Sequence, residues 1–429
     1  MWVAIPFRLE ANDHRTNPPE NPQAYSLVDL SEPCLADGPM NKSPWRTLAA
    51  GCIIAAGFLF VALAYFVGLD EQNAANRDYI GYWAAGQLLV QHKDPYDGSA
   101  TLQLERAKGY IGKEPRLTPS PPVALLLVVP LGFLGAKNGL IFWLLLQLVC
   151  LSLSVWILWI LHGRPANRYH LFGYLFAPAI ACLMAGQLGT FFLLAVVLFL
   201  YFHKFHPALA GAALVPCVLK PHLFVPFAAA LLVWLVSRKA YRIVLGFVIA
   251  LIVNSAVAVY FVHNIWSDYS QMMRASGIQS RFTPTLSLTL RELIPPHAVW
   301  VQYILLVIAC IWAIRYFWRR RNTWDWHVDG MLPLLVSVVC APYAWFTDES
   351  VVLPAILAGI YAASNSRRAL LPIALFGGAA LAEVFFSVDL NTRYYLWTAP
   401  AWLAWYIYAN WPTAANAEAA HPREQAIAE

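Results

Sequence analysis

Residues 76–89 read NRDYIGYWAAGQLL, and they follow a long apolar run that ends at Leu69. The stretch therefore begins where a membrane span would leave the hydrocarbon, and its acid, Asp78, is followed at once by aromatic side chains. On a helix, residues three or four positions apart share a face, so Asp78 and Tyr82 would point the same way. The pattern predicts an amphipathic helix lying in the membrane interface. The rest of the chain is expected to support whatever Asp78 contacts.

The composition is that of an all-α polytopic membrane protein. Of the 429 residues, 59% are hydrophobic and only 12% are charged, about half the charged fraction of an ordinary soluble domain. The net charge of +5 comes from Lys and Arg residues placed between apolar runs, which indicates basic cytoplasmic loops and not a nucleic-acid surface. Six of the seven cysteines fall inside apolar runs, and no Cys-x-x-Cys or Cys/His zinc spacing exists, so neither a disulfide framework nor a metal site is expected.

Twelve apolar runs predict twelve full membrane crossings. The first, residues 47–69, is long enough to cross the roughly 30 Å hydrocarbon core. The others lie at residues 139–161, 169–185, 189–202, 208–219, 223–236, 243–262, 298–314, 330–346, 350–363, 369–388 and 394–411. Basic residues fall on alternate loops, which places those loops and both termini in the cytoplasm by the positive-inside rule.

One further apolar segment, residues 121–136, does not fit this alternation. It is only about sixteen residues long and begins with Pro121 and Pro122, whereas a crossing helix needs about twenty residues. We interpret it as a re-entrant or half-crossing helix that is covered by protein. If it crosses fully, another short segment must fail to cross.

The chain is expected to form one membrane domain between two polar tails. Residues 1–46 are polar, contain several prolines and lack the pattern of a signal peptide, which predicts a disordered cytoplasmic tail. Residues 47–411 form the transmembrane domain, and residues 412–429 form a second disordered cytoplasmic tail. Within the domain, residues 70–120 make a long outer loop that carries Asp78, and amphipathic helices are expected in such loops.

With this topology, an acid, several cations and polar groups gather near the outer surface. Cations can hold a phosphate, and a carboxylate can deprotonate an acceptor hydroxyl. No Asp-x-Asp motif accompanies them, which favours chemistry without a metal. The candidate site residues are Asp78, Tyr82, Trp83, Gln187, Lys220, His222, Arg281 and Asp348.

Each candidate also has a purely structural interpretation. Asp78 could be a solvated charge or a helix cap, and Lys220 could extend its ammonium to the interface, although a cation in such a place by default suggests an anionic partner. His222 could bond to a neighbouring backbone group, and Gln187 could belong to a tight turn with Gly186. Asp348 with the next residue could cap the following helix, and Arg281 could be a solvated loop charge.

Several motifs together resemble one family of membrane enzymes. They are the stretch 78–89, Pro95-Tyr96-Asp97, the Pro-Pro-x-Ala-Leu-Leu of residues 121–126, Gly186-Gln187 and Lys220-Pro221. This order resembles glycosyltransferase family 87, which uses polyprenol-phosphate sugars, has the GT-C fold and includes mannosyltransferases that extend phosphatidylinositol mannosides. The resemblance runs from about Thr47 to about Trp411. It implies an inverting sugar transfer at the outer face of a bacterial inner membrane.

The resemblance also implies roles for single residues. Asp78 matches the family's loop acid and would be the general base, while Lys220 matches the lysine that holds the lipid phosphate. Arg281 or His222 would assist Lys220. Tyr82, Trp83 and Gln187 would line the sugar site, and Asp348 would be a second polar contact. The sequence departs from the family pattern at residues 285–288, which lack the usual Asn, and near Asp348, where many relatives carry histidine.

The expected donor is a polyprenyl-phosphate sugar, with mannose first and arabinose or other hexoses as alternatives. The acceptor would be a glycolipid or glycan, and neither a cofactor nor a nucleic acid is expected. One alternative function is a transporter or flippase of a polyprenol-linked saccharide, which would need a polar route through the bundle. Glu383 is the one deep acid that suits such a route, and it could equally be paired inside the bundle. A non-catalytic assembly protein is a third possibility, but it would leave the long acid-bearing loop without a purpose.

Overall fold

The structure is a computed structural model that describes residues 43–411 except 118, 276–282 and 387–391. The chain divides into two units, Met1–Ser43 and Pro44–Glu429, and the second holds nearly all of the described residues. Its described residues form helices joined by turns, without strands, which confirms the all-α prediction. The tails predicted at residues 1–46 and 412–429 lie almost wholly outside the described residues.

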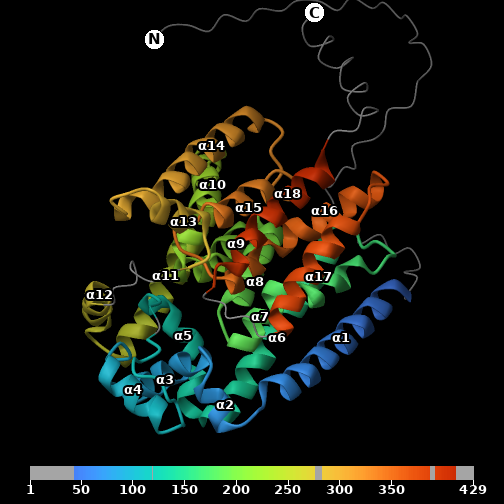
Figure 1. Ribbon diagram of the computed structural model, residues 1–429. Helices are drawn as coiled ribbons and strands as arrows, with labels where there is room; N and C mark the ends of the chain where they lie inside the picture. Colours follow the sequence, from blue (N-terminus) through green and yellow to red (C-terminus); the bar gives the residue numbers. More distant parts are fainter. Residues whose placement is uncertain (1–42, 118, 276–282, 387–391, 412–429) are drawn as a thin grey trace, which may run out of the picture. The chain divides into compact units, whose positions relative to one another are not determined.

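The α-helices are α1 (Ser43–Val67), α2 (Glu71–Ala75), α3 (Tyr79–Val90), α4 (Gly98–Arg106), α5 (Leu125–Val128), α6 (Ala136–Leu161), α7 (Ala177–Ala185), α8 (Gly189–Phe202), α9 (Pro207–Ala213), α10 (Val225–Ser237), α11 (Tyr241–Phe261), α12 (Ile265–Ala275), α13 (Leu286–Leu293), α14 (Ile304–Arg320), α15 (Met331–Val339), α16 (Leu353–Asn365), α17 (Leu371–Phe385) and α18 (Thr398–Asn410) (Figure 1). Short 3-10 helices continue several of them, among them η1 (Pro122–Ala124), η2 (Val129–Phe133), η4 (Val215–Leu219), η5 (Pro221–Leu223) and η8 (Phe346–Val352).

Several helices are long and apolar enough to cross a membrane. In the described part of the chain these are five: Arg46–Leu63, Ala136–Leu161, Tyr241–Phe261, Val299–Arg320 and Phe346–Asn365. Large apolar side chains such as Phe58 on α1 and Ile252 on α11 are exposed. Rows of exposed apolar side chains on helices of this length suit lipid and not water. The protein is therefore a membrane protein, while the count of twelve crossings and the GT-C fold stay predictions.

The segment predicted to be re-entrant forms η1, α5 and η2 in succession. This apolar stretch, Pro122–Phe133, is shorter than the helices that can cross. It packs on α3 so closely that a Cβ atom at Gly86 would overlap the Val128 carbonyl oxygen, and one at Gly132 would overlap the Gly86 carbonyl oxygen. The Trp83 indole donates to the Leu134 carbonyl oxygen at 2.9 Å. Protein thus covers one side of the segment, whereas Leu126 and Phe133 on other sides are exposed, and its place in the membrane stays a prediction.

The structure differs from the expectation that α3 is an amphipathic interfacial helix. Nearly every residue of α3 is buried. The reason is that the segment after Pro122 covers one side of the helix, while the segment after α4 folds back onto another side at Gly81, where a Cβ atom would overlap the Arg116 carbonyl oxygen. Local periodicity does not reveal such a second cover. By contrast α12 buries only Ile265 and Met272, on one side, as an amphipathic loop helix should.

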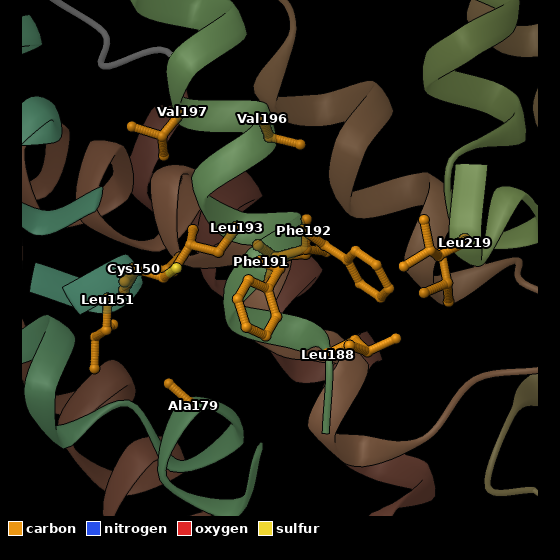
Figure 2. Close-up of a cluster of buried hydrophobic side chains, with 14 of the residues drawn as sticks. Cys150, Leu151, Ala179, Leu188, Phe191, Phe192, Leu193, Val196, Val197 and Leu219 are labelled. Carbon is orange, nitrogen blue, oxygen red and sulfur yellow. The ribbon is translucent and has the colours of Figure 1, made fainter. Parts of the chain in front are cut away.

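Helix α8 lies within the buried core, and the turn between α7 and α8 leads directly into it. Figure 2 shows Phe192 pointing from α8 toward Leu219, and Leu193 pointing toward Cys150 of α6. The helix packs against α6, α9 and η8. Since its side chains fill the space between these elements, the start of α8 is held in a fixed place.

A pair of glycines lets the backbones of α9 and α11 come into direct contact where the helices cross. A Cβ atom at Gly211 would overlap the Ile243 carbonyl oxygen, and one at Gly246 would overlap the Ala208 carbonyl oxygen. Small residues at such crossings are a common way for membrane helices to associate closely.

We predict that Gly246→Ala lowers the thermal unfolding midpoint of the detergent-solubilised protein by several degrees. The added methyl group must push the two backbones apart, and overpacking of this kind costs about 1–3 kcal/mol. Gly377→Ala in α17 is the matched control, since nothing lies within 4 Å of its Cβ position. That control should be neutral or slightly stabilising because alanine is the better helix former. Equal midpoints for the two variants would show that the crossing is not close-packed.

Candidate active site

Asp78 lies at the start of α3 and carries two side-chain partners. Its Oδ1 accepts a hydrogen bond from Arg116 Nη1, and its Oδ2 accepts one from Gln187 Nε2 at 2.6 Å. The carboxylate makes no capping bond to the helix, and the side chain is 40% exposed. Asp78 is therefore held by other segments of the chain and still faces solvent.

The turn between α7 and α8 aims Gln187 at Asp78. Gly186 ends α7 with a φ of +74°, a left-handed conformation that glycine adopts without strain, and a Cβ atom there would press on Tyr79. The Trp143 indole donates to the Gly186 carbonyl oxygen at 2.8 Å, and Gln147 Nε2 donates to the Gln187 carbonyl oxygen. Gln187 thus belongs to a tight turn and also contacts the acid.

Tyr82 joins the same group. Its O–H donates to Gln187 Oε1 at 3.2 Å, and its ring stacks on Trp143 at 5.6 Å between centroids. Burial raises the pKa of the Tyr82 phenol well above its ordinary value, and the charges of Asp78 and Asp348 raise it further. Tyr82 therefore lies near both carboxylates and keeps its proton, so it can donate as well as accept.

Trp83 is placed differently. Its side chain is buried, and its indole N–H is bonded to the Leu134 carbonyl oxygen. In the structure it anchors the Pro122–Phe133 segment to α3.

Lys220 and Asp348 form a buried ion pair. The Lys220 ammonium lies 2.7 Å from Asp348 Oδ1, with the two side chains 12% and 0% exposed. Asp348 Oδ2 accepts the backbone N–H of Trp345 at 3.0 Å, so the acid caps the start of η8 and not a helix beginning at Ser350. Burial is the largest single influence on the pKa of Lys220 and lowers it, but the charge and hydrogen bond of Asp348, together with Tyr343 and Cys182, outweigh burial, and the net shift is upward. The ammonium stays charged inside the protein, where Asp348 is its partner.

His222 follows Lys220 in η5 and offers an unused nitrogen. Its ring lies 5.4 Å from that of Tyr343, and among the described residues its buried Nε2 has no hydrogen-bond partner. Burial lowers the pKa of His222 to about 4, and the charge of Lys220 acts in the same direction. A neutral imidazole beside an ammonium can bond to a ligand oxygen or hydroxyl.

Close backbone packing joins the turn that contacts Asp78 to the element that carries Asp348. Gly189 begins α8, and a Cβ atom there would overlap the Thr347 carbonyl oxygen and the Ser350 hydroxyl of η8. The turn that directs Gln187 to Asp78 therefore rests directly on the element that carries Asp348. The structure brings together Asp78, Tyr82, Gln187, Lys220, His222 and Asp348; Arg281 lies outside the described residues.

Arg116 and Glu105 are site residues that the sequence reasoning missed. Arg116 pairs with Asp78, and Glu105 accepts the backbone N–H of Arg116 with both carboxylate oxygens, at 3.1 and 3.2 Å. Burial raises the pKa of Glu105 to about 7, against the lowering effect of Arg116. Both residues sit among ordinary loop charges. The one available signal was a cation in a loop expected to lie outside, where cations are less common.

Comparison with known proteins bears on this site. The family model of glycosyltransferase family 87 matches residues 120–342, more than half of the chain. The chain belongs to glycosyltransferase family 87. Gln187, Lys220 and His222 lie within the residues matched to family 87, whereas Asp78 and Asp348 lie outside them. No curated protein and no solved structure matches the chain.

We predict that Asp348→Leu destabilises the protein strongly, by about 3–5 kcal/mol, because it leaves the Lys220 ammonium buried without a partner. Adding Lys220→Met should recover most of the loss, since two apolar side chains can replace a buried pair. The measurement is thermal unfolding of the single and double variants in detergent. Lys204→Met is the control: Lys204 pairs with Asp325 at 3.0 Å in an exposed position, where a pair contributes about 0–1 kcal/mol. A double variant no more stable than Asp348→Leu would contradict the prediction.

Proposed function

We propose that this family 87 glycosyltransferase moves a sugar from a polyprenyl-phosphate donor to a hydroxyl of a lipid or glycan acceptor, with inversion, at the outer face of a bacterial inner membrane. The observation that carries the proposal is the joining of the half-exposed Asp78 carboxylate to the Lys220–Asp348 pair through the turn at Gln187. A base and a phosphate-binding cation are the two groups that such a transfer needs.

In the proposed reaction, Asp78 acts as general base. It removes the proton of the acceptor hydroxyl while that oxygen attacks the anomeric carbon of the sugar. The bond between the anomeric carbon and the phosphate oxygen breaks, and polyprenyl phosphate leaves with the electron pair. A single displacement from the opposite side inverts the anomeric configuration. Asp78 suits this role because its side chain is 40% exposed and Gln187 fixes its orientation.

Lys220 is proposed to stabilise the leaving phosphate. An ammonium has three N–H donors, and one of those of Lys220 is directed to Asp348, so the others can face a ligand. The Nε2 of His222, which has no hydrogen-bond partner among the described residues, or Arg281, would add a further contact. Because a phosphate is already a good leaving group, it needs positive charge more than a proton donor, and the proposal requires no metal.

Tyr82 and Gln187 are proposed to bond the sugar hydroxyls. Their mutual hydrogen bond beside Asp78 puts an O–H and an amide close to where the anomeric carbon would lie. The proposal assigns Trp83 to holding the adjacent segment, since its indole N–H is already bonded. Mannose is the proposed sugar, with other hexoses and the pentose arabinose as alternatives.

The transporter alternative gains no support from the deep acids. Glu383 accepts a hydrogen bond from the Trp397 indole at 3.1 Å. Glu349 accepts from the Thr398 hydroxyl at 2.7 Å and from the Trp402 indole at 2.8 Å. The contacts of Glu349 join η8 to α18, and that of Glu383 joins α17 to the residue just before α18, while the buried Oε2 of Glu383 has no hydrogen-bond partner among the described residues.

We predict that Asp78→Asn lowers sugar transfer by about 10²–10⁴-fold, the usual contribution of general base catalysis, while donor binding persists. The assay uses purified protein, a set of radiolabelled polyprenyl-phosphate sugars and a membrane lipid extract. Asp97→Asn is the matched control in the same loop. Asp97 caps α4 by accepting the Ser99 N–H at 2.8 Å, a role that Asn can fill.

Two outcomes would contradict the proposal. Equal transfer by the wild type and Asp78→Asn would remove Asp78 as the base. No transfer by the wild type with any polyprenyl-phosphate sugar would refute the donor class, and flipping of the polyprenol-linked saccharide would then be measured in proteoliposomes.

A further inference from the structure

Asp78, the proposed base, is paired with the Arg116 guanidinium in this structure. Arg116 Nη1 is bonded to Asp78 Oδ1, and Gln187 occupies Oδ2. An acceptor hydroxyl must reach one of these oxygens to lose its proton. Each oxygen can accept more than one hydrogen bond, but the hydroxyl would share Oδ1 with Arg116. Since Gln187 is held by the α7–α8 turn, Arg116 is the partner whose side chain can give way.

The loop that carries Arg116 is built to hold it at this place. Glu105, whose residue surface is 0% exposed, takes the Arg116 backbone N–H with both oxygens. Gly81 admits the Arg116 carbonyl against α3, as a Cβ atom there would overlap it. The backbone of Arg116 is thus fixed, and the side chain beyond it is the part that can turn.

The Arg116 guanidinium has N–H donors that are not used by Asp78. Within the described residues Arg116 Nε is buried without a hydrogen-bond partner, and Nη2 makes one bond of 3.3 Å to the Asn76 carbonyl oxygen. Its carbon Cζ lies 5.4 Å from the centre of the Tyr110 ring, and the side chain is 33% exposed. A guanidinium presents five N–H groups in a planar fork that matches phosphate oxygens in pairs. Arg116 therefore has both the chemistry and the access for an anionic ligand.

We propose that Arg116 binds the phosphate of the lipid-borne donor, and that the phosphate replaces Asp78 as the partner of its guanidinium. The exchange frees Asp78 Oδ1 from the guanidinium when a donor is bound, so that the acceptor hydroxyl does not have to share this oxygen. It also adds a second cation to Lys220 for the departing phosphate. This inference rests on the proposed function, which it extends by a residue outside the family match.

The exchange has a thermodynamic signature that can be measured without turnover. In the wild type the phosphate must compete with Asp78 for Arg116. Removing the Asp78 charge removes that competition, so Asp78→Asn should bind a lipid phosphate more tightly. An ion pair with this much exposure contributes up to about 1 kcal/mol, which corresponds to about a fivefold change in affinity.

The experiment measures equilibrium binding of farnesyl phosphate to the purified full chain in detergent, with farnesol as the probe that lacks the phosphate. Asp78→Asn should bind farnesyl phosphate about fivefold more tightly, and Arg116→Met about tenfold or more weakly. The double variant should bind like Arg116→Met alone, because the competition no longer exists. Arg116→Lys should fall between Arg116→Met and the wild type. Farnesol should not respond to any of these changes.

Lys108→Met is the matched control. Lys108 is a cation of the same loop, 3.4 Å from Glu71 and away from Asp78, so its removal tests the general effect of loop charge. It should leave farnesyl phosphate affinity within about twofold of the wild type, as surface charges do.

Four results would overturn the inference. Wild-type affinity in both Arg116→Met and Arg116→Lys would remove Arg116 from the phosphate site. Tightening by Asp78→Asn that persists in the Arg116→Met background would indicate simple charge repulsion and no exchange. Equal affinity of Asp78→Asn and the wild type would mean that Asp78 does not compete. Inorganic phosphate that binds as tightly as farnesyl phosphate would make the ligand a free anion. Sugar transfer is not used in any of these measurements, so failure of the proposed function would be recognised separately.

Discussion

The candidate site depends on one close approach of three backbones. The turn at Gly186 presses against Tyr79 of α3, and Gly189, three residues later, presses against Thr347 of η8. Because no side chain separates these elements, Asp78 at the start of α3 and Asp348 in η8 are carried by parts of the protein that move together. Trp143 fixes the turn from a third helix, α6, through its bond to the Gly186 carbonyl oxygen.

A second constraint is the cost of charge near a membrane. An isolated ion in a poorly hydrated place loses several kcal/mol of hydration, so the buried Lys220 ammonium needs a partner within the protein, whereas the partly exposed Arg116 guanidinium gains less from one. Lys220 has Asp348 and Arg116 has Asp78. A bare ammonium or guanidinium would attract any anion, whereas a cation with a partner and with donors left over binds only an anion that supplies comparable bonds.

Much of the helical framework could be predicted from apolar runs, because burial in lipid requires them. The run at residues 189–202 coincides with α8, and that at residues 243–262 matches α11 to within two residues. The prediction of one continuous span over residues 330–346 was wrong. Helix α15 ends at Val339, and Ala341–Pro342 begin the turn that leads into η8. Asp78, Gln187 and Lys220 could be identified as candidates by residue type and place. The fold of the segment after α4 over α3, which brings Arg116 to Asp78, could not be predicted, because it depends on packing at Gly81 and not on a local pattern.

The family match and the proposed base lie in different parts of the chain, and the structure explains how they can act together. Residues 120–342 carry the match, whereas Asp78 belongs to the loop before it. Three contacts tie that loop to the matched part: Gln187 on Asp78, the Trp83 indole on the Leu134 carbonyl oxygen, and Gly86 against Val128. The loop is thus packed against the matched part along the whole of α3, and a residue on it can be positioned as firmly as one within the matched helices. An acid so placed stays partly exposed while one of its oxygens is oriented by Gln187, as the proposed role of a base acting on an incoming hydroxyl requires.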